Sequence, residues 1–195
     1  MMIQRLCVFC GSKPGVDEVY QEAASALGRY LAQCRIGLVY GGASVGLMGT
    51  LADAVLRGGG EVIGVIPRAL AVKEIAHKGV ADLRIVGSMH ERKTLMAELA
   101  GAFLAMPGGY GTLDELFEVL TWTQLGLHRK PCGLLNVDGF FDPLIAYLDG
   151  AVGQGFLKPE HRNFLIHSDH PADLVDRLAN MELPQASPWI RPDES

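Results

Sequence analysis

Apolar runs alternate along this chain with segments of helical character, and this alternation limits the possible folds more than any other feature. Six short runs are typical of strands buried on both faces of a sheet, at residues 5–10, 36–40, 61–66, 82–86, 102–106 and 132–136. Helical patterns lie at residues 16–33, 46–57, 88–99, 112–125, 141–152 and 171–180. Strands that alternate with helices form layered sheets. The sequence therefore predicts an α/β protein, a single-domain Rossmann-like doubly wound parallel sheet flanked by helices.

No internal repeat or linker divides the 195 residues, so we expect one domain over residues 1–183. Hydrophobic residues make up 49% and charged residues 20% of the chain, a balance typical of a globular protein with a sizeable core. Residues 184–195 contain three prolines and little periodicity, and we expect them to form a C-terminal tail.

The charge and the length of the apolar runs disfavour several classes of partner. A formal net charge of −5 argues against a surface for nucleic acid or for anionic membranes. No apolar run reaches the roughly 18 residues of a membrane span, and no secretory signal is evident. We therefore expect a cytoplasmic protein that binds neither nucleic acid nor membrane.

The cysteines are expected to be reduced thiols. Cys7 and Cys10 form a C-x-x-C pair, but residues three apart on a strand face opposite sides of the sheet. No second pair and no histidine spacing completes a zinc site. We expect no metal site.

A glycine-rich loop follows the apolar run that ends at Met106. Its sequence over residues 107–115 is P-G-G-Y-G-T-L-D-E, and a helical pattern follows. Glycines at 108, 109 and 111 permit positive φ and close backbone approach, and free N–H groups at a helix start attract anions. The spacing differs from both the Rossmann fingerprint and the Walker loop. We expect a phosphate cradle; a tight turn without a ligand is the alternative.

Two further loops of this kind follow other apolar runs. G-G-A-S-V-G-L-M-G spans residues 41–49, and Gly11 to Gly15 follow the first run. In open parallel sheets, ligands bind beyond the carboxyl ends of the strands where the strand order reverses. The three loops are therefore expected to surround one crevice, to which Ser12 and Lys13 would add a hydroxyl and a charge.

The sequence M-H-E-R-K over residues 89–93 opens a helix at the same edge of the sheet. Arg92 has a planar fork suited to a phosphate or a carboxylate, and Lys93 has a point charge. Such a run alone is usually a solvated helix face, but its position beside the glycine loops favours binding. We expect His90 to be structural.

Taken together, these motifs resemble the Lonely Guy (LOG) family of cytokinin-activating phosphoribohydrolases, many of whose bacterial members have been labelled possible lysine decarboxylases. The paired M-H-E-R-K and P-G-G-Y-G-T-L-D-E motifs are highly specific in combination. Further matching segments are CVFCGS (7–12), VYGGASVGLMG (39–49), TWTQLG (121–126) and KPCGLLN (130–136).

The resemblance implies that residues 1–183 form a nucleotide-binding phosphoribohydrolase domain. Its reaction would cleave the N-glycosidic bond of an N6-isoprenoid adenosine 5'-monophosphate into the free cytokinin base and ribose 5-phosphate, with AMP as a further substrate. Arg92 and Glu115 are the implied catalytic pair. We expect no metal or cofactor, and a homodimer with the site near its interface. The expected substrate-binding residues are Glu74, Arg92, Lys93, Gly108, Gly109, Tyr110, Gly111, Thr112, Leu113, Asp114, Glu115, Thr121, Ser12 and Gly42.

The choice between two neighbouring carboxylates follows from helix geometry. Adjacent helical residues point about 100° apart, so Asp114 and Glu115 cannot both reach one atom. Thr112 and Glu115 also have capping-box spacing, which gives Glu115 a structural alternative. With Arg92 nearby and the family match, we favour Glu115 as the carboxylate that stabilises an oxocarbenium-like state or activates water.

Three other functions remain to be weighed. A decarboxylase would need a Schiff-base lysine, and nothing distinguishes Lys73, Lys78, Lys93 or Lys130, so we reject that activity. A non-catalytic nucleotide or molybdenum-cofactor carrier stays open, although it would not need an acid beside an arginine. An interaction role for helix 113–127 in dimerisation is compatible with catalysis. Ala43, where glycine is common in the family, leaves the substrate preference open.

Overall fold

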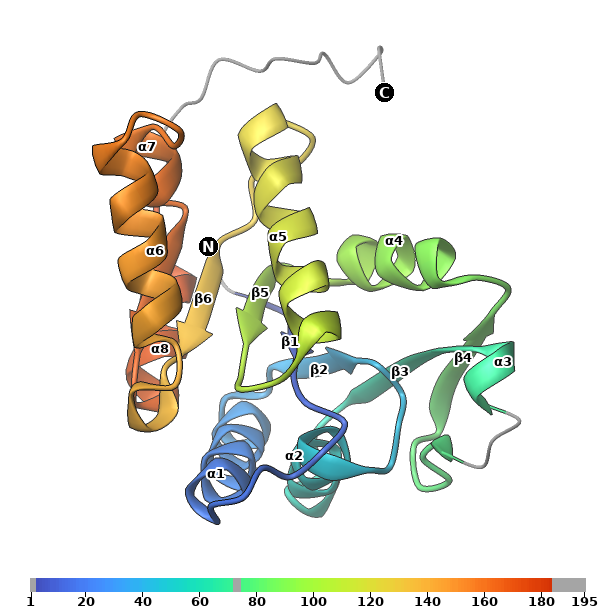
Figure 1. Cartoon of the computed structure of the whole chain (residues 1–195). Helices are drawn as coiled ribbons and strands as arrows, with labels where there is room; N and C mark the ends of the chain where they lie inside the picture. The colour runs from blue at the N-terminus through green and yellow to red at the C-terminus, as the bar shows by residue number, and fades with distance from the viewer. Residues whose placement is uncertain (1–2, 72–74, 184–195) are drawn as a thin grey trace.

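The computed structural model describes residues 3–71 and 75–183, and in them seven strands form one parallel sheet (Figure 1). The strands are β1 (Arg5–Phe9), β2 (Gly37–Tyr40), β3 (Val62–Pro67), β4 (Asp82–Val86), β5 (Ala102–Ala105), β6 (Cys132–Leu135) and β7 (Leu165–Ser168). Their order in the sheet is β4-β3-β2-β1-β5-β6-β7, and every pair is parallel. The predicted doubly wound sheet is confirmed.

The six predicted helices are all present, with ends within three residues of the expected positions. The helices of the described residues are α1 (Val19–Cys34), α2 (Gly46–Arg57), α3 (Arg68–Leu70), α4 (Met89–Leu99), α5 (Tyr110–Leu125), α6 (Asp142–Gly153), α7 (Pro159–Arg162) and α8 (Pro171–Asn180), with a 3-10 turn at Val137–Gly139. The short α3 and α7 were not expected.

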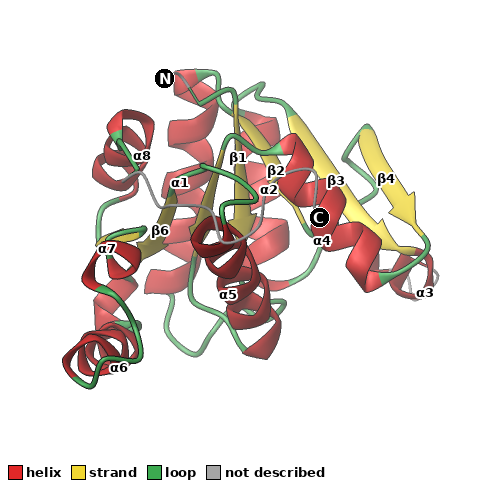
Figure 2. Ribbon diagram, turned by 90° about the horizontal axis from the view of Figure 1, so that it is seen from above, coloured by secondary structure: helices red, strands yellow, loops and turns green. Residues whose placement is uncertain are grey.

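Helices cover both faces of the sheet and divide the core into two halves. One half joins α1, α2 and α8 to one face, with Leu27, Leu51 and Leu174 fully buried. The other half joins α4, α5 and α6 to the opposite face through residues such as Met96 and Leu116. Figure 2 looks onto this second face, with α1 and α2 behind the strands. Alternate residues of β1 serve the two halves, because successive strand side chains point to opposite faces.

The seventh strand is a correction to the sequence prediction, which ended the sheet at residues 132–136. β7 pairs with β6 in parallel, with Leu165 opposite Cys132. It lies at the edge of the sheet, and Ile166 and Ser168 are only partly buried while His167 is exposed. A four-residue edge strand that is half polar lacks the continuous apolar run of a central strand.

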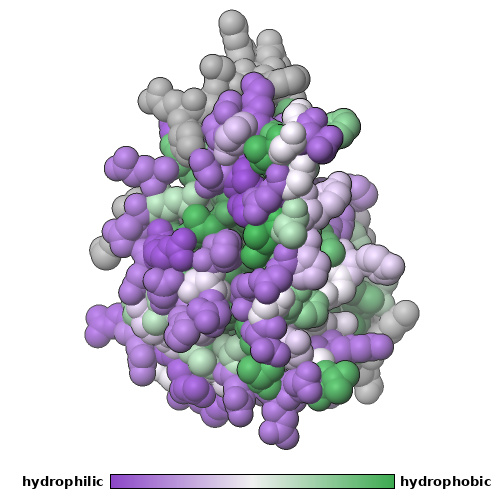
Figure 3. All heavy atoms as spheres, turned by 60° about the vertical axis from the view of Figure 1, so that its left-hand side comes forward, coloured by the Kyte–Doolittle hydropathy of each residue, from purple (hydrophilic) through white to green (hydrophobic). Residues whose placement is uncertain are grey.

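The face shown in Figure 3 is mostly hydrophilic, with hydrophobic residues in small groups. Among the described residues, none of the helices is both long and apolar enough to cross a membrane. The predicted tail at 184–195 lies outside the described residues.

Candidate active site

Backbone hydrogen bonds tie the loops after β1, β2 and β5 together. The N–H of Gly11 donates to the carbonyl of Pro107 over 3.0 Å, and the N–H of Leu47 donates to the carbonyl of Gly11 over 3.1 Å. β1 and β5 are also the strands at which the strand order reverses. The three glycine loops therefore meet at the switch point of the sheet, where open α/β sheets bind their ligands.

The loop after β2 adopts a conformation that only glycine takes readily. Gly42 and Gly46 have φ of +77° and +58°, in the left-handed region. The N–H of Ser44 donates to the carbonyl of Ile75 over 2.8 Å, and Ala43 forms an isolated antiparallel bridge with Ala76. Residues 75 and 76 thus lie along this loop and pair with its backbone.

The N-terminus of α5 points its free N–H groups at this junction. The helix begins at Tyr110, and its N-cap residue, Gly109, makes no side-chain cap bond. Among the first N–H groups, which have no partner inside a helix, none is covered by a capping side chain. In Figure 1 this end is the lower end of α5, close to α4 and to the end of β2. Such an uncapped N-terminus attracts anions.

The structure corrects two details of this loop. Thr112 is not the N-cap residue; it lies inside the first turn of α5, with 3% of its surface exposed. Glycines 108, 109 and 111 are not among the residues with positive φ, and close approach of neighbouring atoms explains the glycine only at position 108. At Gly108 a Cβ atom would lie 2.9 Å from the nitrogen of Gly11 and would collide with the Thr112 hydroxyl.

The capping box lies on α4 rather than on α5. The Ser88 hydroxyl accepts a hydrogen bond from the N–H of Glu91 over 3.1 Å, and the Glu91 carboxylate accepts one from the N–H of Gly87 over 2.7 Å. The same S/T-x-x-E spacing occurs at Ser88–Glu91 and at Thr112–Glu115. Capping of α4 fixes the start of the helix that carries Arg92.

A buried ion pair joins α4 to α5 beside the glycine loops. The Arg92 Nη1 donates to the Glu115 Oε1 over 2.6 Å, and its Nε donates to the carbonyl of Val65 over 3.0 Å. Both charged residues are 8% exposed. Gly41 leaves room for the guanidinium, because a Cβ atom there would collide with it. The predicted pairing of Arg92 with Glu115 is therefore present.

Burial raises the pKa of the Glu115 carboxyl above its usual range. The Arg92 charge acts in the opposite direction and favours the carboxylate, but burial has the larger effect. Raised carboxyl pKa values are typical of groups that exchange protons with a substrate or a water molecule near neutral pH.

Lys93 has partners that the sequence analysis did not foresee. Its ammonium lies 3.2 Å from the Asp114 carboxylate and 3.1 Å from the Glu118 carboxylate. Asp114 thus points to Lys93 while Glu115 points to Arg92, as the geometry of adjacent helical residues requires. The spacing of four between Asp114 and Glu118, which places them on one helix face, was a signal for this cluster.

The structure brings together some of the other predicted site residues and not the rest. Ser12, Tyr110 and Leu113 lie in or next to the loops, and Tyr110 is 95% exposed. Thr121 lies farther along α5, about 9 Å from Glu115 by helix rise, and its hydroxyl donates to the Phe117 carbonyl over 2.7 Å. Glu74 lies outside the described residues.

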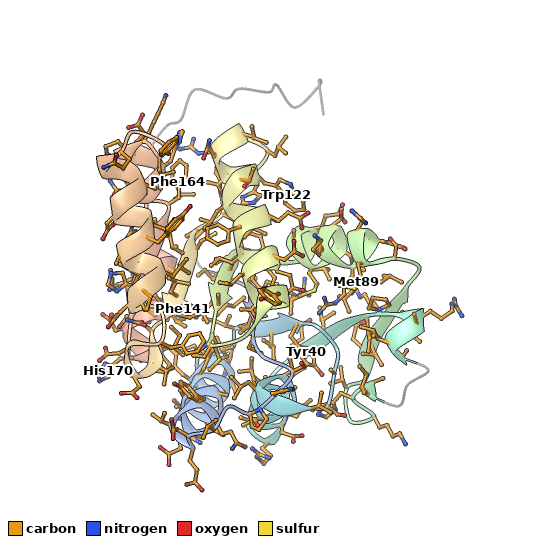
Figure 4. All side chains as sticks on the ribbon, in the orientation of Figure 1. Tyr40, Met89, Trp122, Phe141, Phe164 and His170 are labelled. Carbon is orange, nitrogen blue, oxygen red and sulfur yellow. The ribbon has the colours of Figure 1, made fainter. Side chains whose placement is uncertain are left out.

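A groove in the described surface lies beside the site, and neither Arg92 nor Glu115 lines it. This groove of about 460 Å³ runs along α5 from its N-terminus. It is lined by Tyr110, Leu113, Asp114, Phe117, Glu118, Thr121 and Trp122. A larger, open hollow of about 1000 Å³ lies between α1 and the residues after β6 and β7, and no predicted site residue lines it. Figure 4 labels Trp122 on α5 and Met89 at the start of α4.

The thiols of Cys7 and Cys10 are buried and unreactive. Cys7 and Cys10 are buried on opposite faces of the sheet, in different halves of the core. Burial raises the pKa of each well above its usual range, so both are protonated. Within residues 3–71 and 75–183, no group of three His, Cys, Asp or Glu residues could hold a metal ion.

The Lys130 ammonium donates a hydrogen bond to the Ala97 carbonyl over 2.6 Å, at the end of α4.

Comparisons with known proteins agree with this architecture. Residues 48–178 match the family described as "Possible lysine decarboxylase". A probable cytokinin riboside 5'-monophosphate phosphoribohydrolase of Oryza sativa subsp. japonica, LOGL9, is 53% identical over 175 residues, 90% of this chain and 77% of the relative. The cytokinin riboside 5'-monophosphate phosphoribohydrolase LOG7 of Arabidopsis thaliana is 51% identical over 179 residues, which cover 92% and 82%.

Solved structures with this fold include molybdenum-cofactor proteins. The molybdenum cofactor binding protein of Rippkaea orientalis superposes with a TM-score of 0.66 at 22% identity, over 88% of this chain and 92% of that one. The molybdenum cofactor carrier protein of Chlamydomonas reinhardtii gives 0.66 at 21% identity, over 90% and 96%. At these identities the likeness shows a shared fold only.

The fold and the site define a class of doubly wound α/β proteins in which an uncapped helix N-terminus lies beside a buried arginine–glutamate pair at the switch point. Within that class, the chain belongs to the Lonely Guy family. The family resemblance stated from the sequence motifs is confirmed.

Proposed function

We propose that this protein hydrolyses the N-glycosidic bond of cytokinin riboside 5'-monophosphates, and of AMP, to release the free base and ribose 5-phosphate. The observation that carries the proposal is the buried Arg92–Glu115 pair next to the uncapped N-terminus of α5. The relatives at about 50% identity, named as phosphoribohydrolases, support the same reaction.

In this mechanism the 5'-phosphate binds at the N–H groups that begin α5. The glycines at 109 and 111 leave open space there, because a Cβ atom at either would meet nothing within 4 Å. Binding energy from the phosphate then holds the ribose near Glu115. A riboside without the phosphate would lose this anchor.

Glu115 acts at the reacting carbon. As the bond from C1' to the base breaks, positive charge develops on the ribose and a carboxylate stabilises it. Water adds to C1' and gives up a proton, and the departing base gains one, so the products are the neutral base and ribose 5-phosphate. Arg92 holds the Glu115 carboxylate in place through the 2.6 Å hydrogen bond.

The proposal is tested by chromatography of the bases released from isopentenyladenosine 5'-monophosphate, AMP and isopentenyladenosine. We expect release from the monophosphates and not from the riboside. Glu115→Gln is expected to lower kcat/KM at least about a hundredfold, because it removes the ionisable group while keeping the shape of the side chain. Glu160→Gln, an exposed change on α7, is the matched control.

A different result would support a carrier. If no substrate releases its base while AMP still binds, as measured by calorimetry, the chain holds nucleotides without cleaving them. The position of Glu115 argues against this alternative, because a carrier gains nothing from a buried acid beside its arginine.

The proposal also includes a homodimer in the cytoplasm. Exposed Tyr110 lines the groove along α5, and Met89 at the start of α4 is half-exposed. Apolar residues of this kind are enriched at subunit interfaces. Light scattering on a size-exclusion column gives the mass of the assembly, and a fluorescent fusion gives its location.

A further inference from the structure

Two neighbouring residues of α4 make three ion pairs with α5. Arg92 pairs with Glu115, and Lys93 pairs with both Asp114 and Glu118. The three carboxylates occupy two successive turns of α5, and the two cations occupy one turn of α4. The two helices are therefore connected by a buried pair and, beside it, by a three-membered cluster.

The Lys93 cluster is partly buried and carries no net positive charge. The side chains of Lys93, Glu118 and Asp114 are 13%, 25% and 61% exposed. Burial alone would lower the pKa of Lys93, but hydrogen bonds to Glu118 and Asp114 outweigh it, so its pKa is raised and the ammonium stays charged. Two carboxylates around one ammonium leave a surplus of one negative charge, which repels a phosphate instead of attracting it.

We propose that Glu118 is a positioning residue, which together with Asp114 holds the Lys93 ammonium between α4 and α5. This cluster fixes the position of α4 relative to α5 and so keeps Arg92 aligned with Glu115. This inference rests on the proposed function. It gives Lys93 a role in the alignment of the two helices, in place of the phosphate contact expected from the sequence. The phosphate then depends on the backbone N–H groups of α5.

The charges that face Glu115 allow an experiment to distinguish two roles of Lys93, the alignment of the helices and the binding of the phosphate. They come from Arg92 and Lys93 on α4 and Asp114 on α5. The protonated, uncharged thiols of Cys7 and Cys10 are the titratable groups on the β1 side. Lys93 favours the ionised form of Glu115, and Asp114 opposes it. Loss of the Lys93 charge should therefore move the protonation of Glu115 to higher pH.

The experiment measures kcat, KM and the pH profile of base release from isopentenyladenosine 5'-monophosphate for Glu118→Gln, Lys93→Met and Lys93→Arg. Glu118→Gln is expected to lower kcat roughly fivefold or more and to change KM less than about twofold, because misplacement affects the transition state more than binding. In Lys93→Met, kcat falls similarly and the acid limb of kcat/KM moves to higher pH. Lys93→Arg recovers most of the rate.

The double variant and a control complete the design. Combining Glu118→Gln with Lys93→Met should cost little more than Lys93→Met alone, because the two residues act as a unit. Asp149→Asn removes a carboxylate that lies 2.7 Å from Arg162, away from the site, and should leave the kinetics unchanged.

Two results would overturn the inference. The first is a tenfold rise in KM for Lys93→Met with an unchanged acid limb, which would mean that Lys93 grips the phosphate. The second is native kinetics in Glu118→Gln. If the native chain releases no base, the proposed function fails, and carbon-13 NMR titration of Glu115 then tests the inference by itself. A pKa of Glu115 that rises in both Lys93→Met and Glu118→Gln supports the inference. A pKa that changes in neither variant overturns it.

Discussion

At the scale of single residues, His128 shows how burial sets a protonation state. Its Nδ1 accepts a hydrogen bond from the N–H of Lys130 over 3.2 Å, and its ring contacts those of Phe103 and Trp122. Burial, together with the nearby Lys130 charge, lowers the pKa of His128 to about 4. The imidazole is therefore neutral in the folded protein at neutral pH.

This shift makes the stability of the protein dependent on pH. An unfolded histidine takes up a proton below about pH 6.5, whereas His128 in the folded protein resists protonation down to about pH 4. The unfolded state thus gains protons first, and the free energy of unfolding should fall as the pH is lowered through this window. His128→Asn keeps an acceptor for the Lys130 N–H but does not titrate.

Urea unfolding at about pH 6.5 and about pH 4 measures the effect. We expect the native chain to lose more stability over this interval than His128→Asn does. Equal losses in the two proteins would contradict the role assigned to His128.

At the scale of elements, the glycines before and inside α5 differ in the space that surrounds them. Gly108 packs against Gly11 and the Thr112 hydroxyl, whereas Gly111 has no atom near the position of a Cβ. Gly108→Ala should destabilise the fold by about 1–3 kcal/mol through overpacking. Gly111→Ala should leave the fold as stable or more stable by up to about 1 kcal/mol, since alanine favours helices.

Activity separates these two substitutions further. Under the proposed mechanism, the methyl group of Gly111→Ala occupies the space of the phosphate, so base release should fall while urea unfolding shows a stable protein. A fully active Gly111→Ala variant would argue against phosphate binding at this helix end.

Much of the element pattern was predictable because the central strands are apolar on both faces. β2, for example, is buried at all four positions, Gly37–Tyr40. β7 was not predicted because only its first residue, Leu165, is buried, and the other three are partly buried or exposed at the sheet edge. The start of α5 was misplaced because Thr112 resembles a cap, while Gly109, the actual N-cap residue, offers no side-chain signal.

The site was predictable where one motif faces another and less so elsewhere. Arg92 and Glu115 lie in two segments that the family resemblance already paired, and the structure brings them together. The contact of Lys93 with Glu118 depends on how α4 packs on α5, which residue spacing within one helix does not specify. The contact of Arg92 with the Val65 carbonyl depends likewise on tertiary packing.

At the scale of the whole molecule, the proposed reaction needs only what the chain supplies. A carboxylate at the ribose and a helix N-terminus at the phosphate provide the two electrostatic contributions of the mechanism. We therefore expect base release to stay within about twofold of its normal rate after treatment with EDTA. A loss of activity that magnesium restores would contradict this mechanism.

The central strand β1 is the first strand to be synthesised, but both of its edges are paired only late in synthesis. Leu6 pairs with Leu38 on one side and with Ala102 on the other. As the chain leaves the ribosome, β1 can join β2 early, yet its second edge stays open until β5 follows. The Gly11–Pro107 bond that closes the site forms only with that second pairing. A nascent chain halted before β5 is therefore an open-edged sheet that chaperones can bind, and it has the loops after β1 and β2 but no cradle for an anion.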